Sequence, residues 1–145
     1  MIPMKRILTA FLLSIFLIPN AYSQPVESET KEHFQLQKGQ DYAMLIRNMN
    51  HLNAALKTVK MMEDDARAVD HFEVVICGKI VTELNDHTDL IDRATGSGIT
   101  LSACGMSLNK FSVEKDELPK GIGVVPNGLI RMFDLQEKGY KTIAL

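Results

Sequence analysis

The sequence lacks an excess of basic residues and has few aromatic ones, and these two deficits exclude one large class of function. Its 145 residues contain 16 lysines and arginines against 18 aspartates and glutamates, the formal net charge is −2, and aromatic residues make up 6%. No arginine-rich tract is present. Proteins that bind nucleic acids need clustered positive charge to neutralise phosphates. The sequence therefore predicts no nucleic-acid partner.

Long apolar runs are missing as well. The uncharged run Ile7–Ile18 is shorter than the roughly 20 apolar residues that an ordinary membrane span needs. Two basic residues precede it, and the small residues Ala21 and Ser23 follow it. This layout is typical of a secretory signal peptide. We therefore expect a signal peptide over residues 1–23, a periplasmic or secreted mature chain, and no membrane span after cleavage. An uncleaved membrane anchor is the alternative.

The remainder of the chain has the length of one domain. Residues 24–40 are polar and predict an N-terminal arm, whereas residues 41–145 alternate short apolar segments with segments of helical periodicity. This alternation predicts an α/β sandwich with a parallel sheet, for which we expect the strand order 2-1-3-4-5. The expected strands are Tyr42–Asn48, His71–Val81, Ile99–Ala103, Ile122–Pro126 and Tyr140–Leu145.

The sequence has only two cysteines, and one of them, Cys104, lies at an expected junction between a strand and a helix. Cys104 lies where the expected strand Ile99–Ala103 turns into the expected helix Gly105–Phe111, at the sheet edge where reactive groups collect. The N–H groups of a helix start favour a thiolate, the form that nucleophilic sulfur chemistry requires, and Gly105 leaves the sulfur uncrowded. The alternative is a buried structural cysteine. The pattern leaves both interpretations open.

The second cysteine, Cys77, follows a continuously apolar segment, and this context predicts a core position. In the order 2-1-3-4-5 the first strand separates the two strands that carry the cysteines. Two strand spacings are roughly 9–10 Å, whereas a disulfide needs Cα atoms within about 7 Å. A Cys77–Cys104 disulfide is therefore disfavoured, although loops leave it open.

Three further polar residues are expected at the same edge of the sheet. Asn48 and His51 lie where the first strand turns into its helix, and Asn127 follows the fourth strand. They are candidates to bind an anion or a sulfane sulfur, with helix capping and simple surface exposure as the alternatives. The cluster Asn85–Asp89 has no second ligand cluster beside it, and the glycines of Gly96–Gly98 precede a strand instead of following one. The sequence therefore predicts no metal and no cofactor.

Several stretches together resemble the DsrE/DsrF-like family, and the match covers most of Asp41–Leu145. The resemblance implies a three-layer α/β/α sandwich around a five-stranded parallel sheet, often assembled as trimers or hexamers. In the sulfur-transferring members of the family a cysteine just after the third strand carries persulfide sulfur, and Cys104 occupies the matching position here. The stretches that carry the resemblance are Asp41–Asn48, His51–Met62, Phe72–Asn85, Leu101–Phe111 and Glu117–Tyr140.

Two functions are consistent with these features. The first is a periplasmic or secreted sulfur-handling protein that carries sulfane sulfur as a persulfide on a single cysteine, Cys104, and assembles with copies of itself. Whether such a protein is a sulfurtransferase or only a sulfur carrier stays open, as do its sulfur donor and acceptor. The second is a non-catalytic periplasmic oligomeric module for binding or assembly, in which Cys104 only packs.

Overall fold

Five parallel strands lie at the centre of the structure, a computed structural model that describes residues 39–145. All four neighbouring strand pairs are parallel, as the alternation of apolar segments predicted. The expected signal peptide over residues 1–23 and nearly all of the expected arm over residues 24–40 lie outside the described residues. The strands are β1 (Gln40–Ile46), β2 (Val69–Ile76), β3 (Ile99–Cys104), β4 (Ile122–Val125) and β5 (Lys141–Ala144).

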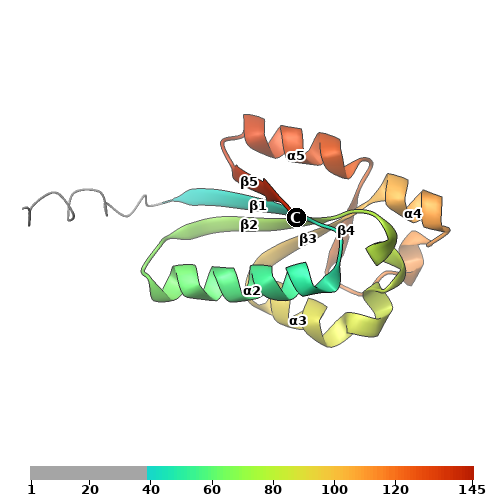
Figure 1. Cartoon of the computed structure of the whole chain (residues 1–145), viewed down its shortest axis with the longest axis horizontal. Coiled ribbons are helices and arrows are strands. Elements are labelled where there is room, and N and C mark those ends of the chain that lie inside the picture. Colours follow the sequence, from blue (N-terminus) through green and yellow to red (C-terminus); the bar gives the residue numbers. More distant parts are fainter. Residues whose placement is uncertain (1–38) are drawn as a thin grey trace, which may run out of the picture. The chain divides into compact units, whose positions relative to one another are not determined.

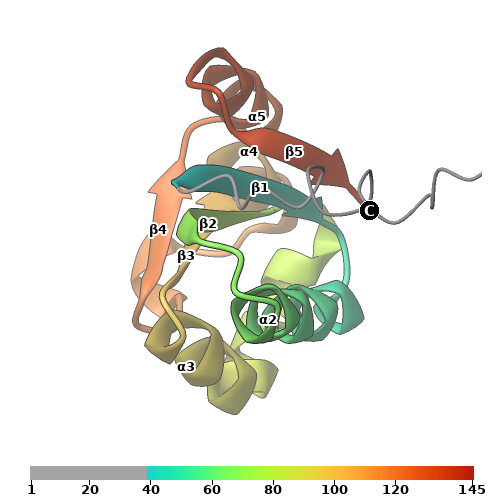
Figure 2. The same ribbon diagram turned by 90° about the vertical axis from the view of Figure 1, so that its left-hand side faces the viewer.

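Helices cover both faces of the sheet and complete the three layers (Figure 1). Helices α2 (Met49–Asp64) and α3 (Thr88–Gly96) pack on one face, and α5 (Gly128–Glu137) packs on the other (Figure 2). The short helix α4 (Gly105–Phe111) follows β3 directly. The α/β/α sandwich is therefore confirmed. Three short 3-10 segments complete the part of the chain that the structure describes: η1 (Lys79–Thr82), η2 (Leu84–His87) and η3 (Lys115–Glu117). No helix of this described part is both long and apolar enough to cross a membrane.

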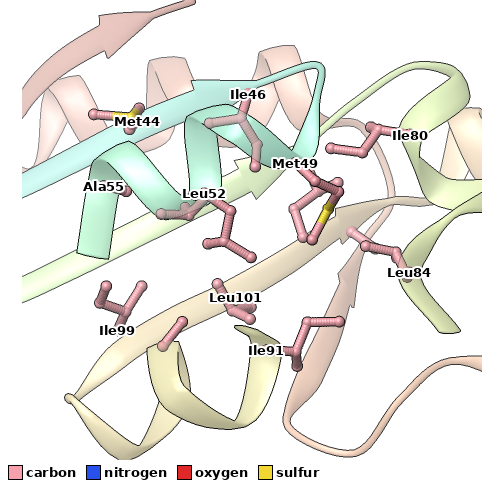
Figure 3. Packing of buried hydrophobic residues seen from close by; sticks show 14 of the residues in the cluster. Met44, Ile46, Met49, Leu52, Ala55, Ile80, Leu84, Ile91, Ile99 and Leu101 are labelled. Carbon is pink, nitrogen blue, oxygen red and sulfur yellow. The ribbon is translucent and has the colours of Figure 1, made fainter. Parts of the chain in front are cut away.

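The larger apolar core lies between the sheet and helices α2 and α3 (Figure 3). Side chains alternate along each strand, so Met44 and Ile46 of β1 contribute to this core, while Ala43 and Leu45 point to the α5 side. Because both faces of the sheet are covered, the central strands β2 and β3 are mostly apolar, and the buried polar side chains on them are Glu73 and Ser102. The smaller core on the α5 side consists of Ala43, Leu45, Val75, Met132 and Leu135.

The strands follow the order β4-β3-β2-β1-β5, so the expected order 2-1-3-4-5 is wrong in placing β1 between β2 and β3. Burial gives the physical reason. Val74, Val75 and Ile76 of β2 are fully buried, which requires strands on both sides as well as helices on both faces. Ile143 in β5 is exposed, as suits an edge strand. With β2 at the centre, β2 and β3 are direct neighbours.

The second strand is also shorter than the expected segment His71–Val81. It ends at Ile76, because Gly78 adopts a φ of 90° and the chain then turns into η1. This positive φ is strained for residues other than glycine. Cys77 consequently lies just after the end of β2 and not inside the strand.

Candidate functional site

Cys77 and Cys104 lie side by side at the carboxyl ends of β2 and β3. The strands pair through Ile76 and Ala103, and the two cysteines are the residues that directly follow these partners in the chain. Both side chains are on the α5 side of the sheet, where the thiols form a hydrogen bond with each other. Both cysteines are free thiols. The separation expected from the order 2-1-3-4-5 is therefore wrong, and we call the two residues the thiol pair.

The two thiols differ in exposure. Cys104, for which the sequence left both a solvent-facing and a buried position open, is buried with an exposed fraction of 5%, whereas Cys77, expected in the core, is half-buried. Gly128, the first residue of α5, packs directly against both, and a Cβ atom added at Gly128 would overlap Cys77 Sγ. The start of α5 therefore covers Cys104, and the turn at Gly78 leaves Cys77 facing an opening.

Cys104 receives hydrogen bonds from three directions. The backbone N–H of Gly128 donates to Cys104 Sγ over 3.2 Å. Ser107, one turn into α4, supports the sulfur through its hydroxyl and its backbone N–H. The Ser107 oxygen also accepts a 2.8 Å hydrogen bond from the N–H of Gly78, so its hydroxyl proton is left to donate to the sulfur. The third donor is the thiol of Cys77.

These hydrogen-bond donors give the two thiols different pKa values. Burial raises the pKa of Cys104, but the hydrogen bonds from Gly128, Ser107 and Cys77 outweigh burial, and the net pKa is lowered. Burial raises the pKa of Cys77 to about 12, and the neighbouring charge and hydrogen bond of Cys104 add to that effect, against a smaller opposing influence of Arg47. Within the thiol pair Cys104 is therefore the more acidic thiol, and Cys77 is the one that keeps its proton more firmly.

A pocket of about 370 Å³ opens over the thiol pair, and we call it the thiol pocket. Its charged lining residues, Arg47 and Lys110, are both basic, and no acidic side chain lies among the described residues that line it. Met106, Phe111 and Leu129 contribute apolar surface. Positive charge beside apolar walls favours a small anion with a polarisable, weakly hydrated body.

The structure places two of the predicted site residues at the thiol pocket and a third directly behind it. Cys104 and Asn127 line it. Asn127 caps α5 by accepting the N–H of Leu129 at 2.8 Å, and its amide donates to Met106 Sδ at 3.1 Å. A Cβ atom at Gly105 would lie 3.1 Å from the carbonyl oxygen of Val125. Gly105 is therefore needed for close packing of α4 against the end of β4.

Asn48 and His51 are not brought to the thiol pocket. Asn48 caps α2, since its Oδ1 accepts the backbone N–H of His51 at 3.1 Å, and its side-chain nitrogen lies 2.9 Å from His51 Nε2. These two side chains serve the start of α2, and their neighbour Arg47 is the residue of this turn that reaches the pocket. The capping interpretation accounts for Asn48 and for the orientation of His51.

A buried ion pair holds α5 against the sheet next to the thiol pair. Glu73 on β2 is 3% exposed and binds Arg131 of α5 through contacts of 3.0 Å and 2.7 Å, while Ser102 of β3 donates to the same carboxylate at 2.8 Å. Burial raises the pKa of Glu73, but the bonds from Arg131 and Ser102 outweigh it and lower the pKa. We call these three residues the α5 anchor. Since Arg131 lies one turn after Gly128, the anchor fixes the N–H that meets Cys104.

Sequence reasoning missed three contributors to the site, namely Cys77, Ser107 and Lys110. Ser107 and Lys110 follow Cys104 by three and six residues, and residues three apart on a helix lie on the same face. That signal was present in the sequence. The role of Cys77 depends on the strand order, which the local pattern does not determine. Within residues 39–145 no group of three or more histidine, cysteine or acidic side chains is arranged to hold a metal ion.

Comparisons with known proteins bear on both the fold and the sequence. The model of the DsrE/DsrF-like family matches residues 13–145, which is most of the chain. No curated protein matches it. The fold is shared with MTH1491, a protein of unknown function from Methanobacterium thermoautotrophicum, at 21% identity and a TM-score of 0.62, over 74% of this chain and 99% of that one.

Two further solved structures share the fold. The conserved protein of unknown function BT1422 from Bacteroides thetaiotaomicron matches at 20% identity with a TM-score of 0.57, over 73% of this chain and 95% of that one. The ychN protein from E. coli matches at 9% identity with a TM-score of 0.57, over 73% of this chain and 99% of that one. Likeness at these identities extends to the fold alone.

Proposed function

This chain belongs to the DsrE/DsrF-like family, and on that premise we propose that it is a sulfur-handling protein that carries sulfane sulfur as a persulfide on Cys104. The observation that carries the proposal is the placement of Cys104 at the thiol pocket, where hydrogen bonds to its sulfur lower its pKa. The match to a family associated with sulfur relay supports the same chemistry. The basic residues Arg47 and Lys110 at the pocket suit an anionic sulfur donor.

Loading follows from the properties of the thiolate. Cys104 Sγ forms a bond to a sulfane sulfur of an inorganic polysulfide anion, and the next sulfur–sulfur bond of the polysulfide breaks. The shortened polysulfide leaves with the electron pair, and Cys104 keeps one added sulfur. The Gly128 N–H and the Ser107 hydroxyl, which hold the thiolate, lie where they also support the persulfide anion. Delivery to an acceptor thiolate reverses the step, and the lowered pKa makes Cys104 a good leaving group.

We further propose that the protein works in the periplasm or outside the cell as a homo-oligomer, a trimer or hexamer. The signal-peptide pattern of residues 1–23 supports export. Large apolar side chains on α5 support self-association, since Ile130 and Phe133 are 56% and 61% exposed. Light scattering at micromolar concentration is expected to give a multiple of the chain mass, and a monomer mass would contradict self-association.

One observation favours the second candidate function, a non-catalytic binding or assembly module. Cys104 is only 5% exposed, and its sulfur accepts the N–H of Gly128 much as a capping atom does. A purely structural role predicts that small thiol reagents reach Cys104 only when the domain opens. Reactivity of the folded protein therefore separates the two functions.

The test is mass spectrometry after exposure of the reduced protein to inorganic polysulfide at neutral pH. We expect a gain of one sulfur atom on the peptide that carries Cys104, because Cys104 is the more acidic thiol. Cys104→Ser is expected to lose this gain, and Cys77→Ser, which also retains a single cysteine, serves as the matched control and is expected to keep it. A persulfide that forms on Cys77 in Cys104→Ser, or none in Cys77→Ser, would contradict the proposal.

A further inference from the structure

The thiol pair offers a second sulfur that the proposed carrier function does not use. We propose that Cys77 is a resolving thiol: it displaces the sulfur held on Cys104, releases it as hydrosulfide and leaves a Cys77–Cys104 disulfide. This inference rests on the proposed persulfide at Cys104. It turns the site from a passive carrier into one that reduces sulfane sulfur to sulfide with its own two thiols.

The backbone geometry suits such a disulfide. Neighbouring strands in a sheet lie about 4.7–4.9 Å apart, and disulfides join Cα atoms separated by about 4.4–6.8 Å. Cys77 and Cys104 directly follow the paired residues Ile76 and Ala103, and both side chains are on the α5 side. Their thiols already form a hydrogen bond. A bond between the two sulfurs therefore needs no strand to shift.

The surroundings argue against a packing role for Cys77. It is half-buried and lines the thiol pocket, whereas the core positions of β2 just before it, Val74 to Ile76, are fully buried. Gly128 packs against both cysteines so closely that a Cβ atom added there would overlap Cys77 Sγ and lie 3.2 Å from Cys104 Cβ, so α5 places no side chain over the thiol pair at this position. A residue that only filled the core would not need to reach a pocket.

The resolving step is balanced without an outside oxidant. The outer sulfur of the persulfide anion first takes the proton of Cys77, which makes Cys77 the thiolate. Cys77 Sγ then forms a bond to Cys104 Sγ, the bond between Cys104 Sγ and the protonated outer sulfur breaks, and that sulfur leaves with the electron pair as hydrosulfide. The sulfane sulfur is reduced to sulfide, and the two cysteine sulfurs are together oxidised to the disulfide. An external dithiol reductant then restores both thiols for the next cycle.

The pocket provides a path for the leaving group. The outer sulfur of the persulfide occupies the thiol pocket, where Arg47 and Lys110 supply positive charge for hydrosulfide. The Cys77 proton, directed at Cys104 in the reduced pair, is close to the sulfur that must receive it. Attack on the outer sulfur instead would move the persulfide to Cys77 and form no disulfide, so the product identifies the sulfur that is attacked.

The experiment follows intact mass and released hydrosulfide over time in the full chain, reduced, freed of reductant and given a limiting amount of inorganic polysulfide without oxygen. For the wild type we expect a short-lived gain of one sulfur, followed by the loss of two hydrogens relative to the reduced protein. Hydrosulfide should appear in step with this loss, and digestion should recover the peptides of Cys77 and Cys104 linked. The rate at which the persulfide is converted to the disulfide should not depend on protein concentration, because both thiols belong to one chain.

The matched variant is Cys77→Ser, whose hydroxyl keeps a hydrogen-bond donor beside Cys104 while removing the second sulfur. Its persulfide should last at least about tenfold longer than that of the wild type, because no internal thiol displaces it. Equal lifetimes, a persulfide on Cys77 or a disulfide only between chains would overturn the inference and leave the proposed carrier function intact. Absence of a persulfide on Cys104 in Cys77→Ser would instead overturn the proposed function, and with it the resolving step.

A second measurement tests the disulfide without any persulfide. Oxidation of the reduced wild type by diamide should give the intramolecular Cys77–Cys104 disulfide at a rate independent of protein concentration. Cys77→Ser and Cys104→Ser should give none. If diamide links only separate chains, the two thiols cannot meet within one chain and the inference is wrong, whatever the polysulfide experiment gives.

Discussion

The two faces of the sheet are built from the same strands but carry different kinds of residue. On the α2 and α3 face the buried side chains are apolar throughout, as around Leu52, Ile91 and Leu101 (Figure 3). On the α5 face the apolar core is small, and the intervening positions hold the α5 anchor and the thiol pair. The α2 and α3 face therefore stabilises the fold, while the α5 face positions polar and reactive groups.

The sharpest contrast is between two residues of β3 whose side chains point to opposite faces. Leu101→Ala is expected to lower the free energy of unfolding by about 2–5 kcal/mol, because it leaves a cavity in the larger core. Persulfide loading of the folded fraction should persist. Cys104→Ser should lower stability less and abolish loading. Urea denaturation measures the free energy of unfolding, and mass spectrometry measures persulfide loading. Equal stability losses would show that the two faces do not differ in this way.

Breaking the α5 anchor should affect both stability and the thiol. Glu73→Gln is expected to cost about 1.5–3 kcal/mol, because the half-exposed Arg131 loses its charged partner and Ser102 loses its carboxylate. The pKa of Cys104 should rise, since the anchor holds Gly128 over the sulfur. The double variant with Arg131→Met removes both charges and should recover part of the stability. A Glu73→Gln protein with unchanged stability and unchanged Cys104 pKa would refute the role of the anchor.

The same carboxylate gives the α5 face a dependence on acid. The folded pKa of Glu73 is lowered, so its contribution to stability is present above its unfolded pKa of about 4.5 and is lost as the pH falls through the lower folded value. Stability measured by urea from pH 7 downward should therefore fall less steeply in Glu73→Gln than in the wild type. Parallel curves would contradict the direction of the shift.

The smallest expected difference in stability is between alanine substitutions at two glycines that lie at helix ends. Gly128→Ala is expected to cost about 1–3 kcal/mol and to displace the N–H donor of Cys104, because the added Cβ overlaps Cys77 and approaches Val75. Gly96→Ala, at the end of α3, meets no atom within 4 Å and should be neutral or slightly stabilising. Thermal unfolding of the two variants checks the difference. An unperturbed Gly128→Ala would mean that α5 does not pack on the thiol pair.

The sequence determines one of these faces far better than the other. Apolar periodicity identifies the helices, and the position of Cys104 after a strand predicts the junction with α4, because both depend on local patterns. The meeting of Cys77 with Cys104 and the approach of Gly128 require the order β4-β3-β2-β1-β5. That order is decided by long-range burial of β2. The site combines three segments, which carry Cys77, Cys104 and Gly128. The local sequence of any one segment therefore predicts only part of it.

Residue-level roles differ in the same way. Asn48 and Asn127 have the same chemical type and the same place after a strand, and both cap helices, yet only Asn127 reaches the thiol pocket. Helix α5 starts beside the thiol pair, whereas α2 starts away from it. The local sequence predicts a cap at each position, and the topology alone decides which cap takes part in the site.

The pH profile of alkylation by iodoacetamide in the folded wild type tests most directly that the α5 face makes Cys104 the more acidic thiol and Cys77 the less acidic one. Peptide mass spectrometry reports the rate at each cysteine separately. We expect the midpoint for Cys104 to be shifted down from the ordinary thiol value of 9.0 and the midpoint for Cys77 to be shifted up towards about 12. Equal midpoints, or labelling of Cys104 only at the rate at which the domain unfolds, would contradict it.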